Sequence, residues 1–511
     1  MSADLNNVQP ASGQPSISPF VPTGEATAML PVDGGKFPPI TVIGTPTIRG
    51  DFDDLCLRQA LNARRAPGVT DVILNPDAHG GYGAPIGCVM VSPTHIYPGP
   101  VGVDIKCSMS LLQLDLPEAA VVDKRTRRAL IEAILERTPT GAGRGSTQAR
   151  KGRHVEETLG RRVVTEGASA SVLSDLGVPT EWASRCEDSY HTGHDGSAEA
   201  LRTRLEILTT GGNSVNLFRS KVTQLGSYGG GNHFGECEIV ELEKNERARE
   251  TAEVFGLRDG YVAFLSHCGS RGWGALLADG QFKSMQRKFA DWGIPLPGGD
   301  RHMVHAPLGS PEANAYLDDM ALGANFATVN HMLINALVLE AFQEVIPGVK
   351  GHLVYFISHN IARKEMVNNQ PAWVHRKGAT RAFPGGHEAL KGTPFATTGH
   401  PILLPGNPQD GSAVMVAEQG AKLSCYSVNH GAGRRMSRTA AHKTLDQAEI
   451  DKSFDRADIL TNCRNYPRDE APRAYKDFEE VLKSVKQAGL ASEVARLRAR
   501  FVIKDGDKAD D

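Results

Sequence analysis

The chain has 511 residues, and its 56 Lys and Arg against 59 Asp and Glu give a formal net charge of −3. A content of 40% apolar and 23% charged residues is ordinary for a globular protein and excludes a disordered chain. We find no apolar run of the roughly 18 residues that a membrane span needs, and we expect no signal peptide. The eight cysteines form no CxxC pair, which predicts reduced thiols in a cytoplasmic protein.

The first predicted elements lead directly to a glycine-rich motif. Residues 1–38 are rich in Pro, Gly, Ser and Ala, which predicts a flexible N-terminal arm. Residues 55–63 have a helical pattern, and residues 69–74 form an apolar run typical of a buried strand. That strand leads into Asn75-Pro-Asp-Ala-His-Gly-Gly81, and residues 120–137 have the apolar spacing of an amphipathic helix.

The stretch 138–213 has the weakest pattern and is treated as a divergent, insertion-like region. Six basic residues lie between positions 144 and 162. Two interpretations remain open for them, a solvated insertion and an RNA-facing flap. These residues are Arg144, Arg150, Lys151, Arg153, Arg161 and Arg162.

Two later apolar runs repeat the design of the first. Residues 261–265 run into a turn that contains His267, and residues 353–357 run into one that contains His359. In α/β architectures, ligand sites collect at the ends of buried strands. Residues 321–345 predict a long core helix.

The C-terminal part carries weaker signals, and no linker separates it from the rest. Residues 447–470 are polar and irregular, and residues 471–497 have the pattern of a pair of helices. We therefore predict one compact catalytic domain over residues 39–505, followed by an acidic tail at 506–511. Its expected class is α+β, with mixed β-sheet layers surrounded by helices.

Candidate metal ligands lie in turns rich in Gly, Ser and Asn. Asp104 and Cys107 are three residues apart, and His233, His267 and His359 each lie in such a turn. One thiolate, one carboxylate and three imidazoles suit a borderline transition metal such as Mn, Zn, Fe or Co. A bridging thiolate could hold two ions, which can clamp the oxygens of a phosphoryl group. For any single histidine, the alternative is a hydrogen-bonded turn residue.

Four glycine-rich turns expose backbone N–H groups that could bind phosphate. They lie at residues 229–233, 376–381, 405–408 and 430–434, and the last precedes a helical pattern at 435–445. His430 in the last turn could attack phosphorus as a covalent nucleophile. The alternative is that His430 is a fourth imidazole of the metal site.

Seven motifs, taken in chain order, resemble the successive signatures of the RtcB RNA ligase family. Their order from about residue 40 to residue 505 is that of the family. The motifs are Asn75-Pro-Asp-Ala-His-Gly-Gly-Tyr-Gly-Ala-Pro-Ile-Gly87, Gly102-Val-Asp-Ile-Lys-Cys107, Leu225-Gly-Ser-Tyr-Gly-Gly-Gly-Asn-His-Phe234, His267-Cys-Gly-Ser-Arg-Gly272, Ser358-His-Asn360, His375-Arg-Lys-Gly-Ala-Thr-Arg381 and Asn429-His-Gly-Ala-Gly-Arg434.

The resemblance implies an RNA ligase of RNA repair or tRNA splicing that uses GTP and two Mn²⁺ ions. Such enzymes join RNA 3′-phosphate or 2′,3′-cyclic phosphate ends to 5′-hydroxyl ends through a guanylylated histidine and an RNA-ppG intermediate. An archease-type activator is an implied partner, and no membrane is expected.

The resemblance also implies a role for each matching residue. Cys107 would bridge the two ions, Asp104 and His233 would complete one site, and His267 and His359 the other. His430 would be the guanylylated nucleophile, Tyr475 would stack on guanine and Lys504 would reach the base. The implied nucleotide contacts are Asn232, His233, Glu236, His359, Asn360, Pro405, Gly406, Asn407, Pro408, Ser412, His430, Gly431, Ala432, Gly433, Tyr475 and Lys504.

Two departures from the family pattern keep alternatives open. Ser108 stands where the family usually has Gly, and residues 407–411 differ from the usual Ser-Met-Gly-Thr-Ala, which bears on guanine preference. One alternative is a paralogue that guanylylates or caps 3′-phosphate ends with weak sealing. Another is a metal-dependent phosphoesterase, for which His430 would be dispensable. A non-enzymatic RNA-binding protein would need basic and aromatic surface and not metal ligands.

Overall fold

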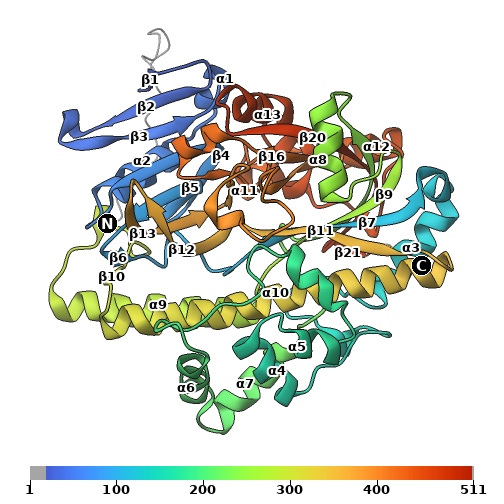
Figure 1. Ribbon diagram of the computed structural model, residues 1–511, viewed down its shortest axis with the longest axis horizontal. Coiled ribbons are helices and arrows are strands. Elements are labelled where there is room, and N and C mark those ends of the chain that lie inside the picture. The colour runs from blue at the N-terminus through green and yellow to red at the C-terminus, as the bar shows by residue number, and fades with distance from the viewer. Residues whose placement is uncertain (1–18, 509–511) are drawn as a thin grey trace.

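Two large β-sheets and their covering helices make up the computed structural model, which describes residues 19–508 (Figure 1). The first sheet has seven strands in the order β1-β2-β3-β4-β5-β13-β12. The second follows the order β11-β7-β9-β8-β20-β16-β15, with β18 beside β20. The predicted class, an α+β fold with mixed sheet layers surrounded by helices, is confirmed.

The first sheet is antiparallel except where β3 and β4 pair in parallel. Helix α2 (Asp54–Arg65) packs on it, and the carboxylate of Asp53 caps its N-terminus by accepting from the N–H of Cys56. The strands are β1 (Val21–Pro22), β2 (Thr27–Val32), β3 (Phe37–Ile43), β4 (Asp71–Tyr82), β5 (Ala84–Ser92), β12 (Asn360–Val367) and β13 (Gln370–Lys377).

The second sheet carries most of the predicted site motifs at its strand ends. Its strands are β7 (Ser108–Pro117), β8 (Phe234–Leu242), β9 (Tyr261–Cys268), β11 (Gly351–Ser358), β15 (Pro401–Asn407), β16 (Gly411–Ala417), β18 (Leu460–Thr461) and β20 (Ala491–Lys504). Three small pairs complete the strands: β6 (His95–Ile96) with β10 (Ala306–Pro307), β14 (Ala379–Arg381) with β17 (Ser427–Asn429), and β19 (Cys463–Asn465) with β21 (Asp507–Lys508).

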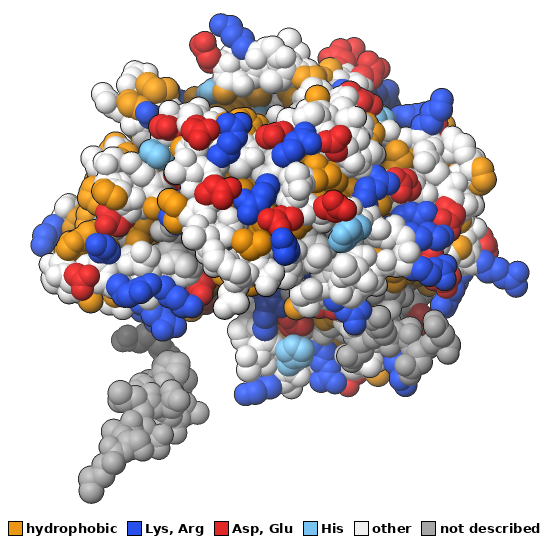
Figure 2. Space-filling model, turned by 90° about the horizontal axis from the view of Figure 1, so that it is seen from below, with side chains coloured by type: hydrophobic (Ala, Val, Ile, Leu, Met, Phe, Trp, Pro, Cys, Tyr) orange, Lys and Arg blue, Asp and Glu red, His pale blue; other side chains and the backbone are white. Residues whose placement is uncertain are grey.

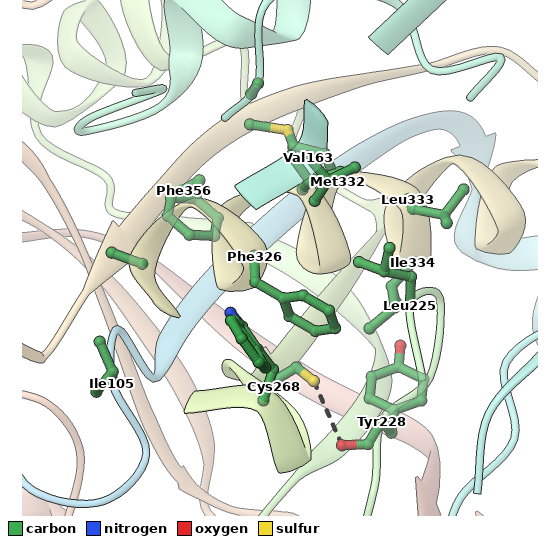
Figure 3. Close-up of a cluster of buried hydrophobic side chains, with 14 of the residues drawn as sticks. Ile105, Val163, Leu225, Tyr228, Cys268, Phe326, Met332, Leu333, Ile334 and Phe356 are labelled. Atoms are coloured by element: carbon green, nitrogen blue, oxygen red, sulfur yellow. Dashed lines mark hydrogen bonds between the residues drawn. The ribbon is translucent and has the colours of Figure 1, made fainter. Parts of the chain in front are cut away.

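Helix α10 (Pro311–Val345) is the central helix of the fold. Its 35 residues span about 52 Å, and it begins ten residues before the predicted start because Ser310 caps it and Pro311 occupies the first turn. It is long and apolar enough to cross a membrane, but 94% of its most apolar stretch is buried inside the protein, as in a core helix. Figure 3 shows Phe326, Met332 and Leu333 of α10 packed among buried side chains from the loops and strands around it.

The stretch 138–213 forms a helical layer on the side of α10 opposite the sheets (Figure 1). Its α-helices are α4 (Glu157–Glu166), α5 (Ala170–Asp175) and α6 (Ala198–Thr209), and α7 (Gly212–Val222) follows. Figure 2 looks onto this side of the molecule and shows basic and acidic side chains interspersed. The remaining α-helices are α1 (Pro46–Gly50), α3 (Lys124–Leu135), α8 (Glu246–Phe255), α9 (Arg271–Trp292), α11 (Arg438–Thr444), α12 (Gln447–Arg456) and α13 (Phe478–Gln487).

The basic residues between 144 and 162 are largely paired with carboxylates. Five of the six make ion pairs, and these pairs neutralise the charge that an RNA-facing flap would need. The structure therefore favours the solvated interpretation. The pairs are Arg150–Glu136, Lys151–Glu344, Arg153–Glu340, Arg161–Glu157 and Arg162–Asp175.

Four predictions about the ends of the chain need correction. Residues 27–32 of the predicted arm form β2, because Ala28, Leu30 and Val32 alternate into the core. Residues 507–508 of the predicted tail pair with β19, and residues 447–456 of the irregular stretch form α12. Residues 491–504 form β20 and not a second helix. Residues 1–18 and 509–511 of the predicted arm and tail lie outside the described residues.

Candidate active site

Four of the five predicted metal ligands lie at the same end of three adjacent strands. Asp104 and Cys107 precede β7, His233 precedes β8, and His267 is the next to last residue of β9. Strand pairing sets His267 opposite Met109 on one side and Phe234 on the other. The sheet therefore brings together ligands that are up to 163 positions apart in the sequence.

His359 occupies a different place, the seam between the two sheets. It is the single residue between β11 of the second sheet and β12 of the first. Its N–H donates to the carbonyl of Cys107 (2.9 Å), and the carbonyl of Asn360 accepts from the N–H of Lys106 (2.7 Å). These backbone bonds hold the fifth ligand against the other four.

The five side chains form two ligand groups that share one thiol. Cys107, His267 and His359 form one group, and Asp104, Cys107 and His233 form the other, with the ligand atoms of each group within 4.8 Å of one another. The Sγ of Cys107 lies 3.1 Å from Nε2 of His267 and 3.5 Å from Nε2 of His233. Nε2 of His233 lies 2.8 Å from the Asp104 carboxylate. Thiol, carboxylate and imidazole donors of this kind fit a borderline transition metal.

An unusual backbone turn brings Asp104 and Cys107 together. Lys106 has a φ of 55°, in the left-handed region that side chains rarely adopt, and the N–H of Cys107 donates to the carbonyl of Asp104. The ammonium of Lys106 is buried and donates to the carbonyl of Asp188 (2.6 Å) and the hydroxyl of Thr328 (2.7 Å). These bonds anchor the strained turn.

Backbone carbonyls orient two of the imidazoles. Nδ1 of His233 donates to the carbonyl of Tyr228 (2.8 Å), and Nδ1 of His267 donates to that of Asn232 (3.0 Å), so both Nε2 atoms face the cluster. Burial holds the pKa values of His267 and His359 well below the usual range, so both are neutral, as metal ligands must be.

The carboxylate and thiol of the cluster have opposite perturbations. Burial raises the pKa of Asp104, but its hydrogen bond and charge interaction with His233 outweigh this and lower it to about 2. Burial, followed by the charge of Asp104, raises the pKa of the Cys107 thiol far above its usual value. Despite its burial, the pKa of His233 is raised well above its usual value by the same contact with Asp104, so the cluster holds a carboxylate, an imidazolium and a protonated thiol.

Helix α10 fixes the turns that carry these ligands. The side chain of Asn330 accepts from the N–H of Gly226 (2.8 Å) and donates to the carbonyl of Gly269 (3.2 Å). In Figure 3 the thiol of Cys268 is bonded to the Tyr228 turn in the same place. The long helix therefore ties the turn before His233 to the end of the strand that carries His267.

The departure at Ser108 has a structural explanation. Its hydroxyl donates to the carbonyl of Cys268 (3.2 Å) and lies 3.0 Å from Nδ1 of His331 on α10. A glycine at this position would leave that buried ring nitrogen without this partner. Ser108 thus adds a bond directly behind Cys107.

His430 stands beside the cluster with its ring held by a carboxylate. Its Nδ1 lies 2.6 Å from Oδ2 of Asp77 and 2.9 Å from the carbonyl of Gly378, and its N–H donates to the same Asp77 oxygen (3.2 Å). Because both neighbours of Nδ1 are acceptors, that atom carries the proton and Nε2 carries the lone pair. The rings of His430 and His359 are 4.7 Å apart.

A cavity of about 670 Å³ borders His430 and reaches His267 of the cluster. This volume is typical of a site for a nucleotide-sized ligand. Among the predicted residues, the lining includes Asn232, Glu236, His267, Pro405, Gly406, Asn407, Pro408, His430, Gly431, Ala432, Gly433, Tyr475 and Lys504. The lining does not include His233, His359, Asn360 or Ser412.

The predicted nucleotide contacts outside the cavity have other partners or positions. His233 and His359 belong to the ligand cluster, and the side chain of Asn360 donates to the carbonyl of Asp104 (3.2 Å) while accepting from the N–H of Gly378 (2.9 Å). Ser412 is buried in β16. The loop 430–433 does not begin a helix, because α11 starts at Arg438, and the N–H of Ala432 already donates to the carbonyl of Pro405.

Buried acidic and basic groups meet at the far end of the cavity. The ammonium of Lys504 lies 3.2 Å from the carboxylate of Glu470, which also accepts from the hydroxyl of Tyr475 (2.6 Å). One carboxylate oxygen of Glu236 is buried and has no hydrogen-bond partner. Burial raises the pKa of Glu236 to about 8, although the charge of Lys504 opposes the shift.

Sequence reasoning missed several residues of this site. Asp77 lay within a recognised motif without an assigned role, and Glu470 precedes the Tyr475 motif by five residues. Arg434 lines the cavity and pairs with Glu470 (3.2 Å). Asn330 lies within an apolar helical pattern, and its polar side chain is the only signal of its role that the sequence offers.

The turn at residues 407–411 is closed by its own hydrogen bonds. The side-chain oxygen of Asn407 accepts from the N–H groups of Gln409 (3.0 Å) and Asp410 (3.1 Å). Its amide donates to the carboxylate of Asp410 (2.5 Å). The side chain of Asn407 is therefore engaged within the turn.

A carboxylate-bound histidine thus stands between a cavity of nucleotide size and a cluster suited to metal ions, which is the arrangement of an enzyme active site. Residues 59–505 match the family model described as tRNA-splicing ligase RtcB. The chain therefore belongs to the RtcB family, and the resemblance of the seven motifs is confirmed.

Three relatives illustrate the extent of the similarity. The tRNA-splicing ligase RtcB of Pyrobaculum aerophilum is 34% identical over 468 residues, which cover 88% of this chain and 91% of the relative. That of Nanoarchaeum equitans is 31% identical over 492 residues, or 93% and 97% of the two chains. The RNA-splicing ligase RtcB of Mycobacterium tuberculosis is 32% identical over 450 residues, or 86% and 98%.

Proposed function

We propose that this protein is a GTP- and Mn²⁺-dependent RNA ligase of RNA repair or tRNA splicing. It would join RNA 3′-phosphate or 2′,3′-cyclic phosphate ends, the latter opened first, to 5′-hydroxyl ends. The observation that carries the proposal is the position of His430, bound to Asp77 at 2.6 Å and set between the cavity and the ligand cluster.

The hydrogen bonds of His430 engage Nδ1 and leave Nε2 as the nitrogen for nucleophilic attack. Asp77 and Gly378 hold the proton on Nδ1, so Nε2 attacks the α-phosphorus of GTP and the bond from that phosphorus to pyrophosphate breaks. The guanylyl group then passes from Nε2 to an oxygen of the RNA 3′-phosphate, which gives the RNA-ppG end. The 5′-hydroxyl attacks the activated phosphorus of that end, and GMP leaves.

The inner end of the cavity is complementary to guanine. A carboxylate accepts hydrogen bonds from the N1 and N2 groups of guanine, and an ammonium donates to O6. Glu236 offers an unpartnered buried carboxylate oxygen, and Lys504 lies near it. The ring of Tyr475, whose hydroxyl is held by Glu470, would stack on the base.

The ligand cluster fits two Mn²⁺ ions. Asp104 and His233 would hold one ion, His267 and His359 the other, and Cys107 would bridge them. The bound ions would neutralise charge on the phosphates, and the thiolate favours a softer ion than Mg²⁺.

The closed turn at 407–411 supports a second candidate function. The side chain of Asn407 bonds within the turn and is therefore not available to contact the nucleotide. This altered contact motivates the alternative of a paralogue that caps 3′-phosphate ends and seals weakly. Accumulation of RNA-ppG without joined RNA would identify that function. A phosphoesterase would instead act without His430.

The decisive experiment is labelling with α-³²P-GTP and Mn²⁺, followed by denaturing electrophoresis and mass mapping. We expect an acid-labile GMP adduct on His430, absent from His430→Ala and present in His442→Ala, which alters an exposed histidine that pairs with Asp469. An adduct on another residue, or ligation by His430→Ala, would refute the mechanism.

Two further proposals concern partners and location. The first is that an archease-type protein activates the enzyme, which a rise in turnover on its addition would demonstrate. We also propose a cytoplasmic location, which is supported by the eight cysteines, all of them free thiols.

A further inference from the structure

The ligand cluster opens to solvent at one residue. The side chain of Asp104 is 30% exposed and that of His233 only 8%, and Cys107, His267 and His359 are buried. Any RNA end that reaches the cluster from outside the cavity must therefore pass Asp104. The surface beside this residue is the place to look for RNA contacts.

Tyr82 lies directly beside this opening. Its hydroxyl accepts from the N–H of Val103, the residue before Asp104, at 3.1 Å. Its side chain is 36% exposed, and the ring of His302 lies 5.3 Å away at 55°. The ammonium of Lys377 lies 4.0 Å from the centre of the Tyr82 ring.

The tip that carries Tyr82 is fixed on both sides. It joins β4 to β5, and the ammonium of Lys377 donates to the carbonyls of Tyr82 and Ala84. The N–H of Gly83 donates to Asp300 (3.1 Å), and a side chain on Gly83 would lie 3.1 Å from the carbonyl of His302, with the backbone at a φ of 71°. The exposed ring therefore stands on a rigid base.

The same strand leads from Tyr82 into the cavity. His79 and Gly80 line the cavity, two to three residues before Tyr82 along β4. Leu55, whose side chain is 43% exposed, packs over Gly80 and also lines the cavity. Strand β4 thus connects the wall of the cavity to Tyr82, beside the exposed side of the cluster.

We propose that Tyr82 and His302 form a stacking platform for a nucleobase at an RNA end that is to be joined. Unpaired RNA bases are bound by stacking on aromatic side chains, and a rigid, exposed ring beside the reacting centre fits this role. The inference rests on the proposed function, because it names where the RNA substrate of that site binds. The base belongs either to the 3′-phosphate strand or to the 5′-hydroxyl strand.

The test combines a side-chain change with removal of the base. Binding of fluorescein-labelled single-stranded RNA would be measured by anisotropy for wild type, Tyr82→Leu and Tyr82→Phe. Two RNAs would be used, one with a 3′-phosphate and one with a 5′-hydroxyl, each with a normal or an abasic terminal nucleotide. Tyr82→Phe keeps the ring and loses only the bond to Val103.

We expect Tyr82→Leu to weaken binding of one normal RNA by roughly 5- to 150-fold, the range for stacking one base. The effect should vanish for the abasic form of that RNA, which identifies the strand, and Tyr82→Phe should bind like wild type. Equal loss with normal and abasic RNA, equal loss in Tyr82→Phe, or no loss would overturn the inference.

Trp292→Leu provides the matched control, because Trp292 is an exposed aromatic residue at the far end of α9. Its binding should equal that of wild type, and an equal loss would show a general effect of exposed rings. The binding assay requires no guanylylation of His430. Failure of this inference and failure of the proposed function therefore appear in different measurements.

Discussion

Replacing Asp77 by Asn tests the proposed role of His430 most directly. The buried Asp77 carboxylate lies 2.6 Å from Nδ1 of His430, and attack by Nε2 on phosphorus makes the ring an imidazolium. With charge centres about 4 Å apart and an effective dielectric of about 20, the attraction is about 4 kcal/mol. Since about 1.4 kcal/mol is tenfold in rate, Asp77→Asn should slow guanylylation roughly 10³-fold.

The assay is single-turnover labelling with α-³²P-GTP in a quench-flow instrument, with Mn²⁺ affinity measured in parallel by calorimetry. Mn²⁺ affinity should change less than about twofold, because Asp77 is not one of the five ligands. Asp279→Asn, which removes an exposed carboxylate on α9, serves as the control for a general charge effect. A loss of less than about tenfold, or a parallel loss of Mn²⁺ binding, would refute the reasoning.

Three other expectations concern the cluster and the base end. Cys107→Ser should weaken Mn²⁺ binding at both sites together, because the shared thiolate is lost; calorimetry that still finds one site at wild-type affinity would contradict the bridge. In wild type, Mn²⁺ should bind more tightly as pH rises and should release protons, because burial raises the pKa of the Cys107 thiol and the proton must leave; binding enthalpies that are equal in buffers of different ionisation enthalpy would argue against this. GTP should bind more tightly as pH rises through about 8, because the buried Glu236 ionises there. Glu236→Gln should bind GTP roughly 10- to 150-fold more weakly and should lose this pH dependence. Displacement of a fluorescent nucleotide measures both effects.

The strands that precede site motifs could be predicted because their apolar runs are short and continuous. The runs at 69–74, 261–265 and 353–357 became β4, β9 and β11. Strand β4 extends to Tyr82, beyond the predicted end, because its Pro- and Gly-rich part stays extended with irregular pairing to β5. Local turn signals alone could not show this.

Strand β20 shows why the C-terminal prediction failed. Its Ala, Arg and Glu residues are good helix formers, so local propensity favoured a helix. In the structure Leu497, Ala499 and Phe501 are buried at every second position, the period of a strand. The partners β8 and β16 decide the outcome, and both are distant in the sequence.

The types of site residue were predictable, but their partners were not. Thiol, carboxylate and imidazole groups in glycine-rich turns predicted the cluster in which Cys107 is shared by both ligand groups. The contacts of His430 with Asp77 and of Lys504 with Glu470 join segments separated by 353 and 34 positions. Such pairs depend on how segments distant in the sequence pack together, which no local pattern encodes.

The seam position of His359 has a thermodynamic consequence. Because one ligand comes from the junction of the two sheets and the others from the second sheet, a bound ion would act as a cross-link that only the folded chain can supply. The unfolding free energy would then rise with the logarithm of free ion concentration, by about 1.4 kcal/mol for each tenfold increase above the dissociation constant of each site. The supply of metal ions would thereby affect the stability of the folded chain as well as its proposed activity.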